Sequence, residues 1–303
     1  TDVVSYATYF DTLRTDVAGG GADDIFWINN AYFAEYADND RLMPIDPSPA
    51  WDPSVVGQFT RNGVLWAVPQ LTDAGIALYY NADLLAADGV SPEELGSTRW
   101  DPDARVDTLR PLLKRLTHGR QWGYNAANDL QGIYLNYIGS AGGTFATGDR
   151  FTFDNPQAAA AFTYLVDLIN TDRVSPPASD TNGNGDFSRN QFLAGRMAVF
   201  QSGTYNLAQI AQQAGFRWGV AMLPTGPAGR ISVTNGIAAA GNPATPHPDA
   251  VRRVLAWLGS AQGNEYVGRQ SAAIPAVLAA QQVYFDDWSA EGGGGTPSFA
   301  VLA

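Results

Sequence analysis

Apolar residues recur along the chain at the spacings that are typical of helices and of strands. The clearest helix spans residues 155–170, where Pro156 stands in the first turn and one face is apolar. Runs that end in polar residues, such as 24–30, predict short buried strands. Because strands and helices alternate, the predicted fold class is α/β. The pattern predicts helices at 8–18, 31–39, 100–117, 130–140, 155–170, 187–194, 207–214 and 248–266, and strands at 24–30, 121–125, 197–200, 218–224 and 235–240.

Three of these helices have apolar residues at the spacing of one face, which we expect to be buried. The faces comprise Leu109, Leu112, Leu113 and Leu116 in the first helix, Phe162, Leu165, Val166 and Ile169 in the second, and Val251, Val254, Leu255 and Leu258 in the third.

Residues 63–85 form the most informative stretch of the chain. A short strand is expected to end at Pro69, followed by a polar elbow at 70–73 and a second apolar strand. Asn81 is the expected N-cap of the next helix, and Asp83 lies in its first turn, where the helix dipole favours an acid.

This stretch resembles the crossing segment of extracellular solute-binding protein family 1, the carbohydrate-binding components of ABC importers. Residues 24–27 and 195–203 (Gly-Arg-Met-Ala-Val-Phe-Gln-Ser-Gly) carry the same resemblance. The resemblance implies a two-lobed, periplasmic-binding-protein-like (type II) α/β fold with a hinge of crossing strands. The maltose-binding proteins and the actinobacterial sugar-binding lipoproteins are the most similar branches.

The resemblance also implies a domain organisation. Lobe I is expected at 1–76 and 235–271, and lobe II at 77–234 and 272–303. Family members begin with a strand, a helix and a second strand, so the N-terminal strand and helix of lobe I are expected to lie outside this sequence. Hinge closure is expected near 78–81, 233–237 and 272–275.

Composition narrows the classes of partner. The chain has 303 residues, enough for two domains, and no run of eighteen apolar residues that would predict a membrane span. A net charge of -12 argues against a nucleic-acid partner, because phosphate binding depends on Lys and Arg. Cysteine is absent, which excludes disulfides and thiolate metal sites within this sequence.

Trp27, Asn29 and Asn30 are the first candidates for ligand contact, because they end a predicted strand. An Asn side chain both donates and accepts hydrogen bonds, as a sugar hydroxyl does. Trp27 offers a broad apolar face to the C–H side of a sugar ring. The alternative is that Trp27 belongs to the core and the asparagines cap the next helix. The resemblance favours the ligand role, since the family has a Phe-Trp pair and a polar residue three positions after the Trp.

Asp73 stands in the elbow and is a further ligand candidate. Its carboxylate could accept two hydrogen bonds from neighbouring hydroxyls or pair with the ammonium of an amino sugar. The alternative is a turn aspartate that binds its own backbone. Relatives in the family carry a sugar-binding acid at this elbow.

Five more residues lie at predicted strand ends. Tyr205 follows Gly203 and Thr204, where the family has Gly-x-Trp, and is expected to form an aromatic wall in the second lobe. The alternative for Tyr205 is core packing. Thr204 lies at the same strand end and is also a candidate for ligand contact. Asn125, Asn235 and Gly236 are weaker candidates, and each of them is as well explained as a turn residue.

Metal and catalytic sites have little support. Residues 180–188 imitate the first half of an EF-hand loop, but the twelfth position is Gln191 rather than glutamate, so calcium binding there stays open. Only His118 and His247 are present, which excludes a His-rich metal site within this sequence, and both are expected at the surface.

The sequence therefore predicts a non-enzymatic binding protein that captures a mono- or disaccharide, with an amino sugar as one alternative, in a cleft between lobes. The rival hypothesis is an extracellular glycoside hydrolase that uses paired carboxylates. The resemblance implies ABC permease subunits as partners, a lipid anchor on an upstream cysteine, and a place outside the cell membrane or in the periplasm. A monomer without cofactor, metal or nucleic acid is expected.

Overall fold

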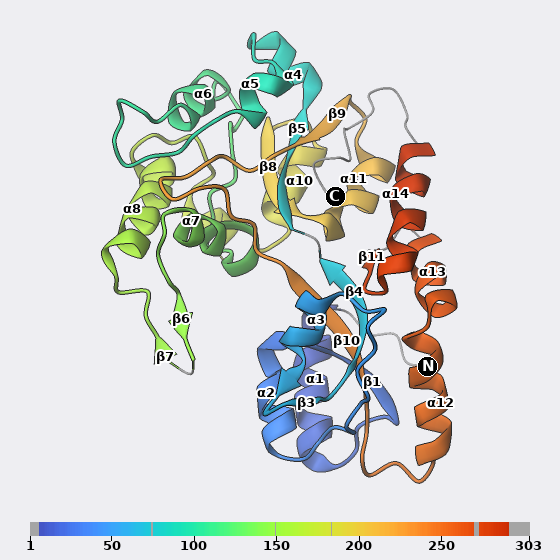
Figure 1. Cartoon of the computed structure of the whole chain (residues 1–303). Helices are drawn as coiled ribbons and strands as arrows, with labels where there is room; N and C mark the ends of the chain where they lie inside the picture. Colours follow the sequence, from blue (N-terminus) through green and yellow to red (C-terminus); the bar gives the residue numbers. More distant parts are fainter. Residues whose placement is uncertain (1–5, 74, 149, 183, 270–272, 291–303) are drawn as a thin grey trace. The chain divides into compact units, whose positions relative to one another are not determined.

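The computed structural model describes residues 6–73, 75–148, 150–182, 184–269 and 273–290, with backbone only at 6–8, 31, 73 and 287–290 (Figure 1). The chain divides into two compact units. The first contains the described residues up to Asp73 and those from Asn235 to Ala290, and the second contains those between them. The chain thus changes unit after Asp73 and again after Thr234.

The first unit is built around an antiparallel sheet of four strands in the order β1-β10-β4-β11. Its elements are α1 (Tyr6–Gly19), β1 (Ile25–Asn29), α2 (Asn30–Asp38), α3 (Pro53–Gln58), β2 (Thr60–Arg61), β3 (Val64–Leu65), β4 (Val68–Asp73), β10 (Asn235–Gly241), α12 (Pro248–Leu258), α13 (Ala261–Arg269), β11 (Ile274–Pro275), η3 (Leu278–Ala280) and α14 (Gln281–Ala290).

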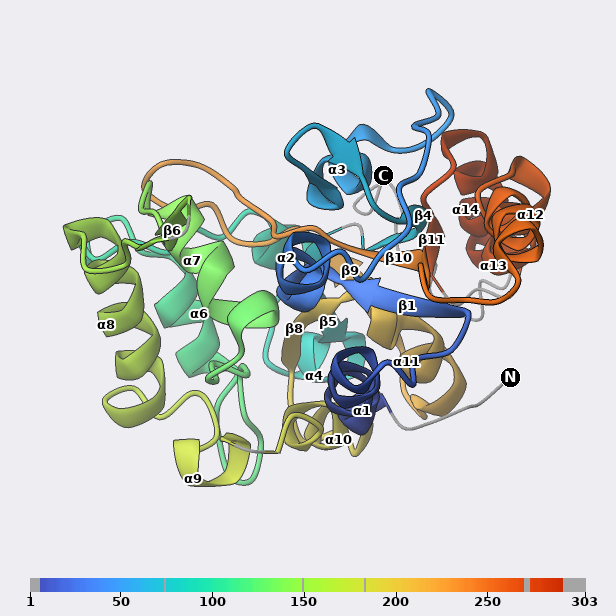
Figure 2. The same ribbon diagram turned by 90° about the horizontal axis from the view of Figure 1, so that it is seen from below.

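The central strand β10 explains why this sheet is buried. Its alanines 238–240 are fully buried and small enough for helices to pack closely over them. Phe33 of α2 and Phe59 after α3 meet edge to face at 5.5 Å, which fills one side of the unit. Helices α12, α13 and α14 lie together on the β11 side of the sheet (Figure 2).

The second unit contains a three-stranded antiparallel sheet in the order β8-β5-β9 and the separate hairpin β6-β7. Its elements are β5 (Ile76–Asn81), α4 (Ala82–Ala87), α5 (Pro92–Gly96), α6 (Leu109–Arg115), the π-helix η1 (Leu130–Tyr134), α7 (Leu135–Ser140), β6 (Ala146–Thr147), β7 (Arg150–Phe151), α8 (Pro156–Asn170), α9 (Ala178–Thr181), α10 (Phe187–Leu193), β8 (Val199–Gly203), the 3-10 helix η2 (Thr204–Asn206), α11 (Leu207–Gln213) and β9 (Trp218–Ala221).

The core of the second unit joins α6, α7 and α8 to the sheet. Trp100 lies about 5 Å from the rings of both Tyr137 and Tyr164, at 5.1 and 5.0 Å between centroids. The four leucines predicted on the inner face of the first helix are all buried in this core. That part of the sequence pattern is confirmed.

Two predicted helix starts are confirmed by side-chain caps. Asn81 Oδ1 accepts the backbone N–H groups of Asp83 and Leu84 at 3.0 and 3.1 Å. Asn155 directly precedes Pro156, the first residue of α8, and its Oδ1 accepts the N–H of Ala158 at 2.9 Å. These bonds satisfy backbone donors that the first turn of a helix leaves free.

The helix predicted at 100–117 is wrong over its first half, because α6 begins only at Leu109. The Asp101 carboxylate accepts the N–H of Asp103, and the Asp103 carboxylate accepts the N–H of Arg105, each at 3.0 Å. These local bonds compete with the helical pattern, and Pro102 lies between them.

The helix predicted at 248–266 is two helices, α12 and α13. Gly259 ends the first, and its carbonyl accepts the indole N–H of Trp51 at 2.7 Å. Ser260 then starts the second, with its hydroxyl accepting the N–H of Gly263. Val254 is exposed instead of inward, as is Val166 on α8, where Ala158, Ala161 and Leu168 face the core.

The remaining strand predictions change in two places. Residues 121–125 form no strand but two isolated bridges, an antiparallel one between Gln121 and His118 and a parallel one between Trp122 and Met197. The expected elbow at 70–73 is part of β4, because β10 and β11 pair with this strand on either side. Gln70 within it is buried and donates to the carbonyl of Leu258 at 3.2 Å.

The described residues 273–290 belong to the first unit, whereas the expected lobe II included 272–303. The reason is that β11 pairs with β4, and α13 and α14 pack against β11. The expected bend at 78–81 lies inside β5, flanked by β8 and β9. Within the described residues, no helix has both the length and the apolar character needed to span a membrane.

Candidate functional site

Trp27 lies in the middle of β1 with its side chain 44% exposed, while Phe26 and Ile28 on either side are buried. Alternation along a strand places neighbouring side chains on opposite faces of the sheet, so Trp27 points away from the core. The backbone of Trp27 is fixed by Tyr9, whose hydroxyl accepts its N–H at 2.8 Å and donates to its carbonyl at 3.1 Å. Core packing, the alternative for Trp27, is therefore wrong.

The two asparagines follow at the end of the same strand. Asn29 is half-buried and is paired with Ile237 of β10, and Asn30 is the exposed first residue of α2. The amide of Asn30 donates to Oε1 of Gln58 at 3.4 Å. The strand end therefore presents amide groups beside an exposed indole.

Gln58 connects this strand end to the start of β10. Its Oε1 also accepts the N–H of Gly236 at 2.9 Å. A Cβ on Gly236 would lie 2.7 Å from Cγ1 of Val55, so the close approach of α3 to β10 requires glycine there. Gln58 was not among the residues predicted from the sequence, because only the fold brings α3 and β10 together across 178 residues.

Asn235 and Asp73 are register partners at the ends of β10 and β4. Asn235 Oδ1 accepts the N–H of Gly236 at 3.0 Å. The side chain of Asp73 is outside the described part of the structure, so only its backbone place is assigned. Six predicted residues, Trp27, Asn29, Asn30, Asp73, Asn235 and Gly236, thus lie on three neighbouring strands or their ends within the first unit.

In the second unit, Tyr205 stands just past the end of β8 and its side chain is 44% exposed. Its ring lies against Gly203, where an added Cβ would come within 2.3 Å of Cε1. The Ser202 hydroxyl donates to the phenol oxygen at 3.3 Å. The predicted aromatic wall is thus exposed, and its packing against the core is excluded.

Thr204 and Asn125 are 3% and 4% exposed, so neither offers much surface to a ligand. The Asn125 amide donates to the carbonyl of Gln201 at 2.9 Å, and its oxygen accepts the N–H of Gln201 at 2.7 Å. Asn125 therefore fixes β8, which leads to Tyr205.

Gln201 is a second residue that the sequence analysis did not identify. Its side-chain oxygen accepts the hydroxyl of Tyr124, and its amide donates to the carbonyl of Gly132 in the π-helix at 2.7 Å. Burial raises the pKa of Tyr124 well above its ordinary value, so this phenol stays protonated and keeps donating. The network holds η1 beside β8, the strand that leads to Tyr205.

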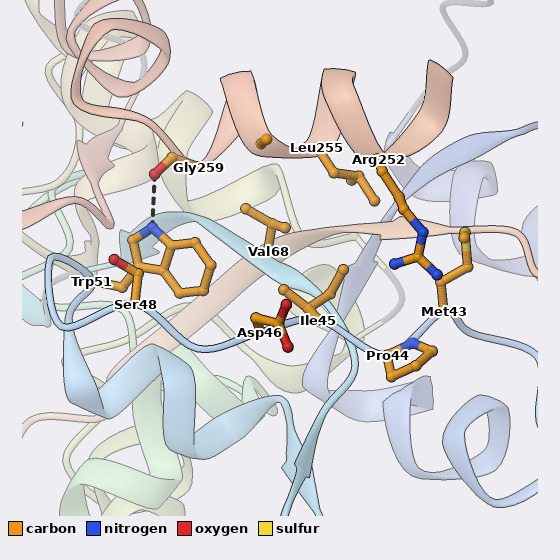
Figure 3. A pocket seen from close by; sticks show the side chains of 11 residues that line it. Met43, Pro44, Ile45, Asp46, Ser48, Trp51, Val68, Arg252, Leu255 and Gly259 are labelled. Carbon is orange, nitrogen blue, oxygen red and sulfur yellow. Dashed lines mark hydrogen bonds between the residues drawn. The ribbon is translucent and has the colours of Figure 1, made fainter. Parts of the chain in front are cut away.

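A cavity of about 390 Å³ lies elsewhere in the first unit, between residues 43–51 and α12 (Figure 3). Apolar side chains of Ile45, Val68 and Leu255 form its walls, and Arg252 and Asp46 add charges. No predicted ligand residue lines it.

Ion pairs involve two further residues that the sequence analysis mentions, His118 and Asp186. His118 is exposed and its Nε2 lies 2.9 Å from the carboxylate of Asp88. In the calcium-like loop, Asp186 pairs with Arg189 at 2.9 Å. Among the described residues, no three His, Asp or Glu side chains gather as a metal site.

Comparison with known proteins agrees with this architecture. The family profile described as bacterial extracellular solute-binding protein matches residues 1–265. A probable ABC transporter-binding protein of Deinococcus radiodurans is 28% identical over 251 residues, which are 79% of this chain and 58% of that protein. The chain therefore spans less than two thirds of the length of this relative.

Two solved structures extend the comparison. UspC of M. tuberculosis is 66% identical, with a TM-score of 0.81 over 100% of this chain and 80% of UspC. Maltose-bound MalE3 of T. maritima shares the fold at 23% identity, with a TM-score of 0.77 over 96% of this chain and 74% of MalE3. The predicted type II periplasmic-binding-protein fold is confirmed by these similarities. From the profile match over most of its length, the chain belongs to the bacterial extracellular solute-binding protein family.

Proposed function

We propose that this chain is the carbohydrate-binding component of an ABC importer. The observation that carries the proposal is the exposed indole of Trp27 at a strand end that also presents the amides of Asn29 and Asn30. An aromatic face and groups that both donate and accept are the chemistry that recognises a sugar ring and its hydroxyls. MalE3, which shares the fold, is bound to maltose, and this supports a carbohydrate ligand.

The ligand we propose is a mono- or disaccharide held by both units. In the first unit Trp27, the two asparagines, Asn235 and Asp73 contact it, and in the second unit Tyr205 provides the stacking face. Asp73 contributes a carboxylate that accepts from vicinal hydroxyls or pairs with the ammonium of an amino sugar. Capture is binding alone, without a catalytic acid and nucleophile.

We also propose where the protein acts. Family membership supports capture outside the cell, and the name of the Deinococcus radiodurans relative supports transfer to ABC permease subunits. A lipid anchor upstream of the present sequence would hold the protein at the membrane surface.

The test is a thermal-shift screen of the full-length protein against mono- and disaccharides, including amino sugars. A ligand at one hundred times its Kd adds about 2.7 kcal/mol to the free energy of unfolding. Calorimetry then compares the wild type with Asp73→Ala, for which we expect binding weaker by about 1.5–3 kcal/mol, the range for a hydrogen bond to a charged group. Asp16→Ala, on the exposed side of α1, is the control and should bind as the wild type does.

No shift with any sugar would contradict the proposal. Turnover of nitrophenyl glycosides would instead support the rival hydrolase. An Asp73→Ala variant with unchanged affinity would leave Asp73 as the last residue of β4, without a role in ligand binding.

A further inference from the structure

Among the described residues, the chain connects the two units twice, after Asp73 and after Thr234. On the side of the first unit, the two connections begin as neighbouring strands, because Asp73 pairs with Asn235 and Thr72 with Gly236. The ladder between β4 and β10 therefore holds both connections in one register as they leave the sheet.

On the side of the second unit, one serine joins the same two connections. The Ser232 hydroxyl accepts the N–H of Ile76 at 2.6 Å and lies 3.4 Å from the carbonyl of the same residue, to which it can donate. Ser232 is two residues before the second change of unit, and Ile76 is the first residue of β5. Gly75 has a φ of +83°, and a Cβ there would lie 2.9 Å from the Ser232 oxygen, so this close approach is built for glycine.

The next residue, Val233, is fastened to the body of the second unit. Its N–H donates to Oδ1 of Asn136 at 2.8 Å, and the Asn136 amide donates to the carbonyl of Gln131 at 2.7 Å. Asn136 is 3% exposed and belongs to α7, directly after the π-helix. The second connection is thereby held to buried structure up to one residue before the unit ends.

The hydrogen-bonded pair of Ser232 and Ile76 lies next to Tyr205, the residue proposed to stack on the ligand. Ile76 pairs in register with Gly203, against which the ring of Tyr205 lies. A shift of Ile76 would therefore act directly on Gly203, its partner at the end of β8.

We propose that Ser232 is a positioning residue for ligand capture: by joining the two connections at Ile76, it confines the bend between units to a few residues. A short pivot leaves the units fewer relative positions, so less conformational entropy is lost when both units hold one ligand. The inference rests on the proposed function for its effect on affinity, but its effect on the connection does not require a ligand.

The test measures distances between the units by double electron–electron resonance. The chain has no cysteine, so Asp11→Cys and Arg120→Cys, both at exposed positions, place one spin label in each unit. Ser232→Ala in this background is compared with Ser232→Thr, which keeps the hydroxyl. Ser97→Ala is the matched control, because it removes an exposed serine hydroxyl that donates to the carbonyl of Glu94 at 3.0 Å within the second unit alone.

We expect a broader ligand-free distance distribution for Ser232→Ala, and distributions like the parent for Ser232→Thr and Ser97→Ala. For a sugar that binds the wild type, Ser232→Ala should raise the Kd roughly two- to tenfold, which corresponds to the loss of one hydrogen bond. An unchanged distribution in Ser232→Ala overturns the proposal whether or not a sugar is found. A broadened distribution with unchanged affinity overturns the role in capture, and absence of any sugar binding by the wild type contradicts the proposed function alone.

Discussion

At the scale of residues, the position of the Tyr205 ring depends on the absence of a side chain at Gly203. The ring lies so close to this glycine that a Cβ would come within 2.3–3.0 Å of three ring carbons. Gly203 has an ordinary φ of -82°, so alanine is compatible with its backbone. Substitution there tests the place of the ring without deleting it.

We predict that Gly203→Ala displaces the exposed Tyr205 ring and weakens sugar binding by about 0.5–1.5 kcal/mol, the range of a specific aromatic contact. The fold should survive, because an exposed side chain can rotate away at small cost. Calorimetric titration measures the loss, and circular dichroism checks the fold. Gly215→Ala is the control, since nothing lies within 4 Å of a Cβ at Gly215. Equal affinity of both variants would remove Tyr205 from the ligand site.

At the scale of elements, α6 and α8 are joined by buried charges. Asp107, which precedes α6, accepts the hydroxyl of Tyr164 of α8 at 3.1 Å, and its carboxylate lies 3.4 Å from Arg110 Nε. The Arg110 guanidinium also lies 4.6 Å from the centre of the Tyr164 ring. Beyond the end of α8, the buried side-chain carboxylate of Asp172 lies 2.7 Å from Lys114 and 3.3 Å from Arg110. Burial raises the pKa of Asp107 above its ordinary value despite these partners.

This shift predicts the direction of a pH effect. A folded-state pKa above the unfolded one means that the folded protein binds the proton more tightly, so Asp107 favours folding more as the pH falls. The free energy of unfolding of the wild type relative to Asp107→Asn should therefore rise from neutral pH toward pH 4, as measured by urea titration. Asp103→Asn is the control of opposite sign, because the hydrogen bond from Arg105 lowers the pKa of Asp103. The same trend in both variants would contradict this assignment.

At the scale of the whole molecule, the described residues form two compact units, each with a core of its own, and the chain passes between these units after Asp73 and after Thr234. Proteins with two domains and short paired connections commonly bend about a few residues when a ligand binds. The connections after Asp73 and Thr234 are the places where such bending would occur.

We predict a smaller radius of gyration when a sugar is bound, because a ligand held by residues of both units draws them together. Small-angle X-ray scattering with and without the ligand measures this. A non-binding sugar from the same screen is the control. Confirmed binding with an unchanged radius would show that the site is preformed.

Local sequence determined much of the fold. Asn81 and Asn155 start their helices as predicted, since a cap acts on N–H groups only two or three residues away. The periodicity of the leucines in α6 fixed its buried face. The Phe-Trp-Ile run of β1 predicted a strand, and the asparagine that follows marked its polar end. Alternation of side chains along a strand is a local property that needs no distant partner.

Tertiary structure decided which strand ends belong to the same unit and which polar side chains already bind other parts of the protein. Gln70 reads as part of a polar elbow, yet pairing of β4 with β10 and β11 makes it a buried strand residue. Asn125 reads equally well as a ligand amide or as a turn residue, yet both its polar side-chain atoms bind the backbone of Gln201. Gln58 and Ser232 gave no local signal, because each acts across more than 150 residues of sequence. Such contacts depend on chain topology, which sequence periodicity does not specify, and this is why only the fold revealed them.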